Sequence, residues 1–259
     1  MRELITAVDI FTDDSVFLLV IWSEDSKIYL AKDPSRRMDQ VDTELLNTLQ
    51  GDLVPNNHIY PPWKDGIKAA PTPLLPDLYL KTCQKVWGYD GTSMIADCVA
   101  KEVRIMELIS SKPHPNICCY YGCIREGDLI RGIVLQKYRC TLLDVISPNK
   151  DSDIQTPPFN IEMVVNGIQD RLNHIHSFGL AHNDVNPTNI MLDDVGNAVI
   201  IDFDSCAPIG TPVYGGTPGW TNWPTVAAID NDTYGFELIV KFLRGEYDGR
   251  FDDNDMPIV

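Results

Sequence analysis

The stretch HNDVNPTN at residues 182–189 and the stretch IIDFD at residues 200–204 decide the fold of this chain. Between them lies the polar sequence DDVGN, flanked on each side by a short apolar run, which is typical of a β-hairpin. A hairpin at this place folds Asp202 back beside Asn189. We therefore expect the side chains of Asp184, Asn189 and Asp202 to converge.

Three oxygen-bearing side chains that converge in this way suit one kind of chemistry. Carboxylate and amide oxygens are the hard ligands that Mg²⁺ prefers. Phosphoryl transfer needs Mg²⁺ on the phosphates, a cation beside them and a hydroxyl aimed at the γ-phosphate. The alternative is an ordinary turn with solvated aspartates, but further motifs occur along the chain in a consistent order.

The two stretches resemble the catalytic loop H-R-D-x-x-x-x-N and the metal-binding loop D-F-G of protein kinases. The resemblance covers residues 78–240 and is of the Ser/Thr type, similar to small fungal protein-kinase-domain proteins. It implies that Asp184 orients the substrate hydroxyl and that Asn189 and Asp202 hold Mg²⁺.

Two residues upstream resemble the ion pair of that family. Lys81 ends an apolar run and resembles the strand lysine that holds the phosphates of ATP. Glu102 lies on the helix that we expect over residues 93–109 and resembles the partner of that lysine. The alternative for each is an ordinary solvated side chain.

The segment IVLQKY at residues 133–138 resembles the strand and hinge that bind adenine, with Leu135 as the gatekeeper. The resemblance implies that the hinge backbone hydrogen-bonds the base and that the following residues contact ATP: Lys81, Leu135, Gln136, Tyr138 and Met191.

Two segments downstream of the hairpin complete the resemblance. The segment Gly216-Thr217-Pro218 resembles the end of an activation segment, and its Thr217 is expected to hydrogen-bond near Asp184. Asp232 resembles the aspartate that holds the catalytic loop, and Asp230 is a second candidate for that role.

Several family features are replaced or missing. No G-x-G-x-x-G precedes Lys81, and no A-P-E follows the activation segment. Asn183 replaces the loop arginine, so activity is expected not to depend on a phosphorylated activation segment. Asn186 stands where Ser/Thr kinases carry a lysine, and Asp204 replaces the glycine of D-F-G.

The resemblance implies an α+β, bilobal fold with a β-rich N-lobe and a shortened, mainly helical C-lobe. We expect a β-rich extension and proline-rich linker over residues 1–77 and a kinase-like domain over 78–259, with lobes at about 78–138 and 139–259. A helix is predicted over about 161–176. Its inward residues are expected to be Met163, Val164, Ile168, Leu172 and Ile175.

The formal net charge of −16 argues against nucleic acid and anionic membrane surfaces as partners. No apolar run is long enough to cross a bilayer, so we expect a cytoplasmic monomer with possible nuclear access. The seven cysteines have irregular spacing, which favours buried reduced thiols over disulfides or a zinc site.

The first hypothesis for function is therefore ATP- and Mg²⁺-dependent phosphorylation of a protein Ser/Thr hydroxyl. A second is a catalytically weak or inactive nucleotide-binding scaffold, because the glycine loop and the lysine at Asn186 are missing. A third is a small-molecule kinase of the aminoglycoside-phosphotransferase type, because those enzymes also replace the loop arginine.

Overall fold

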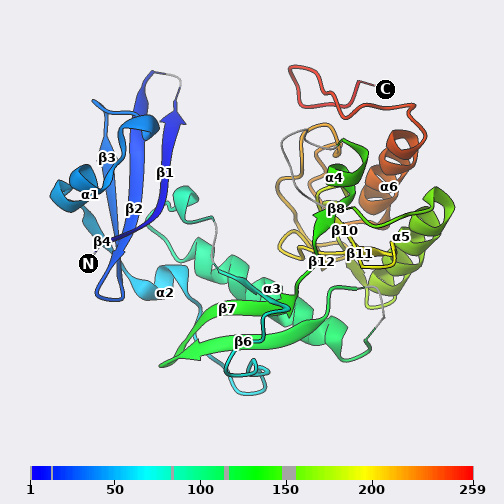
Figure 1. Cartoon of the computed structure of the whole chain (residues 1–259), viewed down its shortest axis with the longest axis horizontal. Coiled ribbons are helices and arrows are strands. Elements are labelled where there is room, and N and C mark those ends of the chain that lie inside the picture. The colour runs from blue at the N-terminus through cyan, green and yellow to red at the C-terminus, as the bar shows by residue number, and fades with distance from the viewer. Residues whose placement is uncertain (1, 13, 83–84, 114–116, 148–155, 259) are drawn as a thin grey trace. The chain divides into compact units, whose positions relative to one another are not determined.

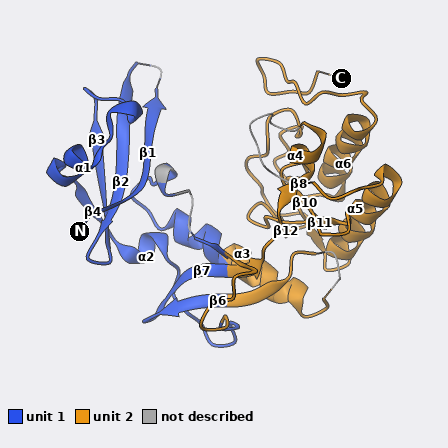
Figure 2. Cartoon of the chain, viewed as in Figure 1, with its two compact units in different colours: residues 1–69, 80–100, 123–133 blue, residues 70–79, 101–122, 134–259 orange. Residues whose placement is uncertain are grey.

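The computed structural model describes residues 2–12, 14–82, 85–113, 117–147 and 156–258 (Figure 1). The chain divides into two compact units, coloured separately in Figure 2. Unit 1 comprises residues 1–69, 80–100 and 123–133, and unit 2 comprises residues 70–79, 101–122 and 134–259. The predicted domain boundary between residues 77 and 78 stays a prediction.

Unit 1 contains a four-stranded antiparallel sheet in the order β1-β2-β3-β4. Its strands are β1 (Glu3–Phe11), β2 (Val16–Glu24), β3 (Lys27–Asp33) and β4 (Asp52–Val54). One face buries Leu18, Val20 and Trp22, and the other buries Leu19 and Ile21. Because both faces are covered, the central strand β2 is a continuous apolar run without alternation.

The β-rich extension predicted for the start of the chain includes β1, which has no clear sequence pattern of its own. This edge strand is only partly buried along its length and has an irregular register between Leu4 and Thr6, so it lacks a clean alternation of apolar and polar residues. Residues 52–59 lie within the extension and proline-rich linker predicted over residues 1–77 and have regular structure. That part forms β4 and the short helix α2 (Asn56–Ile59), which buries Ile59.

Two further short helices follow β3, namely η1 (Met38–Gln40) and α1 (Thr43–Thr48). Asp42 is the N-cap of α1, and its carboxylate accepts the Leu45 N–H at 2.7 Å. This contact satisfies one of the amides that a helix leaves free in its first turn.

A second sheet has the order β5-β7-β6 and is formed by β5 (Leu78–Lys81), β7 (Leu129–Gln136) and β6 (Tyr120–Glu126). The proline-rich segment before β5 bonds to the β6–β7 hairpin through its backbone. Pro61 O accepts the Ile130 N–H, and Lys68 O accepts the Cys123 N–H. The elements η2 (Lys85–Gly88) and α3 (Met94–Ser110) follow β5.

Unit 2 holds the helices α4 (Leu142–Ile146), α5 (Ile161–His176) and α6 (Ile229–Leu243). Its short strands are β8 (Cys140–Thr141), β9 (Leu180–Ala181), β10 (Ile190–Leu192), β11 (Ala198–Ile200) and β12 (Ala207–Pro208). They form a sheet β11-β10-β8 and a pair β12-β9.

The bounds of α5 are those that the sequence predicted, and four of its five inward residues are buried. The exception is Met163, which is 40% exposed, so that part of the prediction was wrong. Met163 lies in the first turn of the helix and about 100° around the axis from the buried Val164. The buried position that the pattern did not identify is Arg171.

The predicted hairpin is present as β10 and β11, with Ile190 opposite Ile200. Asp193 organises the turn, because its carboxylate accepts the N–H groups of Val195 and Asn197. Gly196 adopts a φ of +85°, which glycine tolerates without strain. Among the residues that the structure describes, no helix is both long enough and apolar enough to span a bilayer.

Candidate active site

The carboxylate of Asp184 lies at the centre of a hydrogen-bonded group in unit 2. Thr217 Oγ1 donates to Asp184 Oδ1 at 2.8 Å, which confirms the predicted contact between these residues. Asn189 Nδ2 donates to Asp184 Oδ2 and to the Asp184 carbonyl, both at 2.9 Å. The catalytic-loop residues Asp184 and Asn189 are thus brought together as the spacing predicted.

Asn186 connects the members of this group and is completely buried. Its Nδ2 donates to Asp184 Oδ1 at 3.1 Å and to Thr217 Oγ1 at 3.0 Å. Its Oδ1 accepts the backbone N–H groups of Thr188 and Asn189. The sequence indicated only that a lysine is missing here. The structure shows that the asparagine shapes the loop.

The catalytic loop is anchored by Asp232, near the start of α6. The Asp232 side chain is fully buried, and it accepts the backbone N–H groups of His182 at 2.8 Å and Asn183 at 2.7 Å. His176 Nε2 lies 2.8 Å from the same carboxylate. Asp230 is exposed, so the structure decides between the two candidates in favour of Asp232.

Asn183 occupies the position of the family's arginine and has a different role. Its φ of +64° lies in the left-handed region, which asparagine tolerates better than most residues. Its Nδ2 donates to the carbonyls of Ala181 and Ser205, and its Oδ1 accepts from Asn231 Nδ2 at 2.9 Å. A local sequence pattern carries no signal for the contacts with Ser205 and Asn231, because these residues are distant along the chain.

Asp202 follows the hairpin directly and has a φ of +61°. The preceding residue, Ile201, donates its N–H to the Asn189 carbonyl at 3.0 Å, so the backbones beside these two residues are in contact. His182 supports the same region. Its ring packs edge-on against Phe203, and its Nε2 lies 3.0 Å from the Ile201 carbonyl.

The donor set suits Mg²⁺ held together with phosphates. Because Asn189 Nδ2 is the atom bonded to Asp184, these contacts do not use the Asn189 Oδ1 atom, which is the atom that a metal would need. Among the described residues, no three His, Cys, Asp or Glu side chains form a group that could hold a metal ion by themselves. Mg²⁺ is usually bound by one or two carboxylates plus substrate phosphates and water. The assignment of Asn189 and Asp202 as its ligands stays a prediction.

The predicted strand and hinge, residues 133–138, comprise the end of β7 and the two residues after it. Leu135 is buried, and Gln136 is held by its side chain, which donates to Asp77 O at 3.1 Å and accepts from Tyr121. The backbone N–H groups of Gln136 and Lys137 bond to carbonyls, whereas that of Tyr138 has no partner in the described part of the chain. Tyr138 therefore offers a backbone donor.

Two other members of the predicted ATP-binding set are Tyr138, which follows β7, and Met191, in β10. Burial raises the pKa of the Tyr138 phenol, so this side chain stays neutral at physiological pH. Met191 is half-buried in β10, opposite Val199 of β11 and Thr141 of β8.

Lys81 is the last residue of β5 and belongs to unit 1, whereas Glu102 lies on α3 and belongs to unit 2. Glu102 is buried and Lys81 is half-buried. Their predicted ion pair stays a prediction. The sequence HPNI at residues 114–117 resembles the stretch that follows this helix in the family, and its residues 114–116 lie outside the described residues.

The predicted burial of the cysteines holds for some of them and not for others. Six cysteines are free, and four of them are buried: Cys118, Cys123, Cys140 and Cys206. Cys98 and Cys119 are exposed, so burial is not general. Cys83 lies outside the described residues.

Comparison with known families decides the assignment. The model of the protein kinase domain family matches residues 81–224, which is more than half of the chain. The chain belongs to the protein kinase domain family. The match includes the catalytic loop, the hairpin and the segment that carries Thr217, and the β-rich and helical parts agree with a shortened bilobal kinase fold.

The chain is also similar to individual kinases. The human serine/threonine-protein kinase/endoribonuclease IRE2 is 27% identical over 135 residues, which are 48% of this chain and 14% of that protein. The serine/threonine-protein kinase Tao of Drosophila melanogaster is 29% identical over 157 residues, 60% of this chain and 13% of that protein. The kinase TAO1-A of Xenopus laevis is 28% identical over 157 residues. The chain thus spans about one seventh of these relatives.

Proposed function

We propose that this chain transfers the γ-phosphoryl group of ATP to a Ser or Thr hydroxyl of a protein, with the help of Mg²⁺. The observation that carries the proposal is the contact of Asp184 with both Asn189 and Thr217. This contact holds one carboxylate beside an amide oxygen that can bind metal. Kinase relatives of the Ser/Thr type support the choice of substrate.

Each residue has a role in this proposal. Asp184 accepts a hydrogen bond from the substrate hydroxyl and orients it toward the γ-phosphate. Asn189 and Asp202 bind Mg²⁺, which neutralises phosphate charge when it is bound. Lys81 holds the phosphates and pairs with Glu102. The Tyr138 N–H binds the adenine edge, with Leu135, Gln136 and Met191 around the base.

A transfer assay tests the proposal. The wild-type chain, with radiolabelled ATP, Mg²⁺ and a basic general substrate such as histone, is expected to label Ser and Thr. Asp184→Asn removes the carboxylate at nearly constant shape and is expected to lower the rate by about 10²-fold or more. Chelation of Mg²⁺ by EDTA is expected to abolish labelling.

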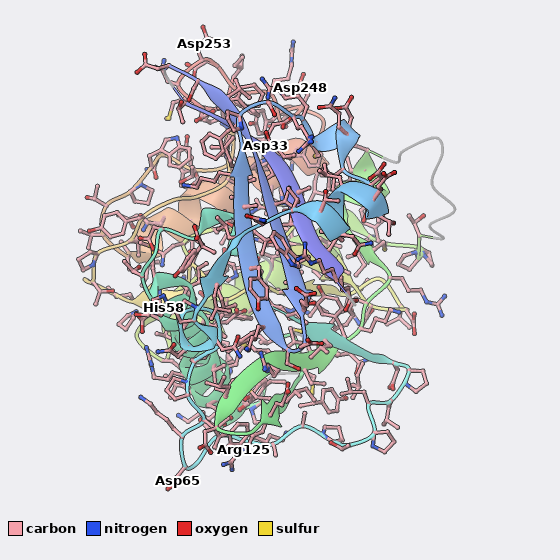
Figure 3. The ribbon with its side chains drawn as sticks, turned by 90° about the vertical axis from the view of Figure 1, so that its left-hand side faces the viewer. Asp33, His58, Asp65, Arg125, Asp248 and Asp253 are labelled. Carbon is pink, nitrogen blue, oxygen red and sulfur yellow. The ribbon has the colours of Figure 1, made fainter. Side chains whose placement is uncertain are left out.

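The matched control is Asp253→Asn. It makes the same chemical change at an exposed residue of the C-terminal segment, labelled in Figure 3, and is expected to keep the wild-type rate. Equal rates for wild type and Asp184→Asn would refute the assigned role of Asp184. Labelling of an aminoglycoside in place of protein would favour the small-molecule alternative.

A non-catalytic nucleotide-binding scaffold is the second candidate. It is favoured by Asn186, because this buried amide puts no cation beside the γ-phosphate position. Thermal unfolding separates the two candidates. A rise in melting temperature with Mg·ATP, together with no transfer to any substrate, would support the scaffold. No shift at millimolar ATP would contradict both.

A further inference from the structure

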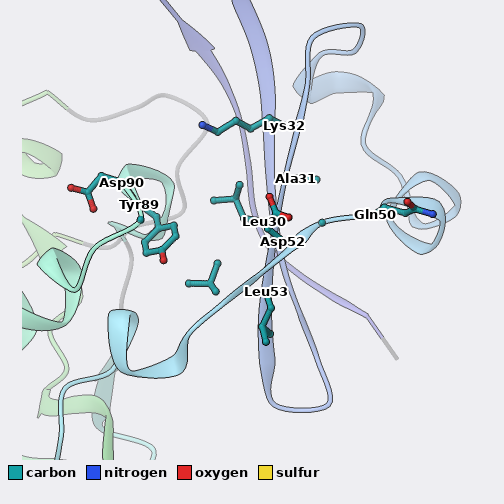
Figure 4. Close-up of a pocket in the computed structure, with 11 residues that line it drawn as sticks. Leu30, Ala31, Lys32, Gln50, Asp52, Leu53, Tyr89 and Asp90 are labelled. Atoms are coloured by element: carbon teal, nitrogen blue, oxygen red, sulfur yellow. The ribbon is translucent and has the colours of Figure 1, made fainter.

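A pocket of about 690 Å³ lies in unit 1 beside β3 and β4 (Figure 4). Figure 4 shows the Lys32 ammonium group reaching into the space beside Asp52, whereas the carboxylate of Asp90 points away from it. The positive and negative groups on the wall offset each other, so the pocket does not select a ligand by charge. The proline-rich segment before β5 indicates its partner more clearly.

This segment has the sequence PTPLLP at residues 71–76. All six residues are exposed, and the two leucines, Leu74 and Leu75, are 39% and 54% exposed. None of the six carries a charge, although the net charge of the whole chain is −16. A partner that covers the segment therefore removes apolar surface from water without having to desolvate a charged group.

The segment is held at its two ends and is free between them. Before it, the Lys68 carbonyl accepts a backbone N–H of β6, and after it, the Asp77 carbonyl accepts the Lys137 N–H at 3.0 Å. Among the described residues, the only backbone hydrogen bond of residues 70–76 closes a turn that ends at Leu78. The backbone of the segment thus belongs to no sheet or helix and is available to a partner.

The prolines decide which mode of peptide recognition fits. Pro71, Pro73 and Pro76 have no N–H group, so the segment cannot add as a strand to a partner's sheet. Proline also breaks a helix, which excludes binding as an amphipathic helix in a groove. Proline fixes φ near the value of a polyproline II helix. This conformation loses little chain entropy on binding and is read by grooves lined with aromatic side chains.

The spacing of the residues predicts which of them face the groove. A polyproline II helix has three residues per turn, so Pro73 and Pro76 lie on one row of the helix, about 9 Å apart. Leu75 lies on the neighbouring row, directly before Pro76. Leu74 lies on the third row, which points away when the other two rows are covered.

We propose that residues 71–76 bind, as a polyproline II helix, in the aromatic-lined groove of an SH3 domain of a partner protein. Pro73 and Pro76 pack against the aromatic rings of that groove, and Leu75 packs beside them. The segment precedes the residues that match the kinase family, so the proposed phosphoryl transfer does not account for it.

The test is binding of the full chain, without ATP, to an array of purified SH3, WW and EVH1 domains. Each domain that binds is labelled with fluorescein and titrated with the chain by anisotropy. We expect at least one SH3 domain to bind with a micromolar Kd, and we expect a synthetic peptide of residues 68–79 to compete. The WW and EVH1 domains are expected not to bind.

Substitutions within the segment test the residues that face the groove. Pro73→Ala/Pro76→Ala is expected to weaken binding at least about tenfold, because both rings leave the groove. Leu75→Ser is expected to weaken binding by a similar factor, whereas Leu74→Ser should bind like wild type. These two leucines are neighbours and are both exposed, so the pair separates a specific register from a general loss of apolar surface.

The proline control is Pro34→Ala/Pro55→Ala, which replaces two exposed prolines outside the segment and is expected to bind like wild type. The melting temperature of each variant shows that the fold is retained. Four results would overturn the proposal: no binding to any SH3 domain, binding to WW or EVH1 domains alone, full binding by Pro73→Ala/Pro76→Ala, or equal weakening by Leu74→Ser and Leu75→Ser. Because binding is measured without nucleotide, its failure leaves phosphoryl transfer untouched, and a failed transfer assay leaves this binding untouched.

Discussion

At the scale of single residues, Asp232 shows how one buried side chain positions a loop that is distant in sequence. Its two oxygens accept two successive backbone N–H groups, those of His182 and Asn183, and His176 contacts it as well. A buried carboxylate is tolerated only when it is well satisfied by donors. The buried carboxylate therefore needs these hydrogen-bond donors, and the two backbone N–H groups need the carboxylate as their acceptor.

The substitution Asp232→Asn is expected to lower the free energy of unfolding by about 2–3 kcal/mol, because hydrogen bonds to a charged acceptor are lost and the new amide NH₂ group faces other donors. Urea denaturation measures the change. Asp230→Asn, two residues away and exposed, is the matched control and should stay within about 0.5 kcal/mol of wild type. Similar losses in the two variants would show that Asp232 is not the anchor.

At the scale of elements, α5 contains an unusual pair on its buried face. Arg171 is only 3% exposed, and its Nε and Nη1 atoms have no hydrogen-bond partner within the described chain. Burial lowers the pKa of this guanidinium to about 10, although Asp170 and Asp193 act in the opposite direction. A methyl group at Gly167 would overlap with Arg171 Nη1, so the glycine makes room for the guanidinium.

This packing predicts that the effects of Gly167→Ala and Arg171→Ala are coupled. In the Arg171→Ala background, Gly167→Ala is expected to stabilise α5 by up to about 1 kcal/mol through helix propensity. With Arg171 present, this gain should be lost or reversed, which gives a coupling of about 1 kcal/mol or more. Urea denaturation of the wild type, the two single variants and the double variant measures this coupling. Additive effects of the two substitutions would contradict an overlap between a methyl group at Gly167 and the Arg171 guanidinium.

A second element-scale contact ties residues 247–250 to the end of the activation segment. The Tyr247 hydroxyl lies 2.6 Å from the Gly219 carbonyl oxygen and 3.0 Å from that of Arg250. The ring of Trp220 packs edge-on against both Tyr247 and Phe242. Burial raises the pKa of Tyr247 to about 12, whereas an unfolded tyrosine has its ordinary value of 10.0.

Because the folded state keeps the Tyr247 proton longer than the unfolded state, its contribution to stability is present below pH 10 and is lost as the pH rises toward 12. Tyr247→Phe is expected to lower the free energy of unfolding by about 1–2 kcal/mol at neutral pH. The gap to wild type should shrink at about pH 11.5, as measured by urea denaturation. Tyr214→Phe, at a residue that is 88% exposed, should show no gap at either pH.

At the scale of the whole molecule, the net charge of −16 is the dominant feature. Carboxylates such as Asp65, Asp248 and Asp253 are exposed, and Figure 3 labels them. Like charges on a compact chain repel one another and reduce its stability. The same charge favours encounter with basic protein segments.

The melting temperature is therefore expected to rise by a few degrees between about 10 and 100 mM NaCl, as the screening length falls from about 30 to 10 Å. The control replaces three exposed carboxylates in Glu44→Lys/Asp65→Lys/Asp253→Lys, which changes the net charge from −16 to −16 + 6 = −10. This variant should show a smaller salt effect. A lower melting temperature of the wild type in salt would contradict the role of self-repulsion.

The features that the sequence alone determined are local ones. Turn chemistry and short apolar runs predicted the β10–β11 hairpin, and the period of apolar residues predicted the bounds of α5. The family motifs predicted that Asp184, Asn189 and Thr217 meet, and they do. These features could be predicted because each depends on residues close in sequence or on a motif with fixed spacing.

Only the tertiary structure decided between Asp230 and Asp232, showed that Asn186 links Asp184 to Thr217, and formed the pocket beside β3. Apolar periodicity also did not predict that Arg171 is buried, because a buried cation does not fit the apolar pattern that defines a core face. The physical reason is shared. These arrangements depend on which groups far apart in sequence meet after folding, and no local pattern records that.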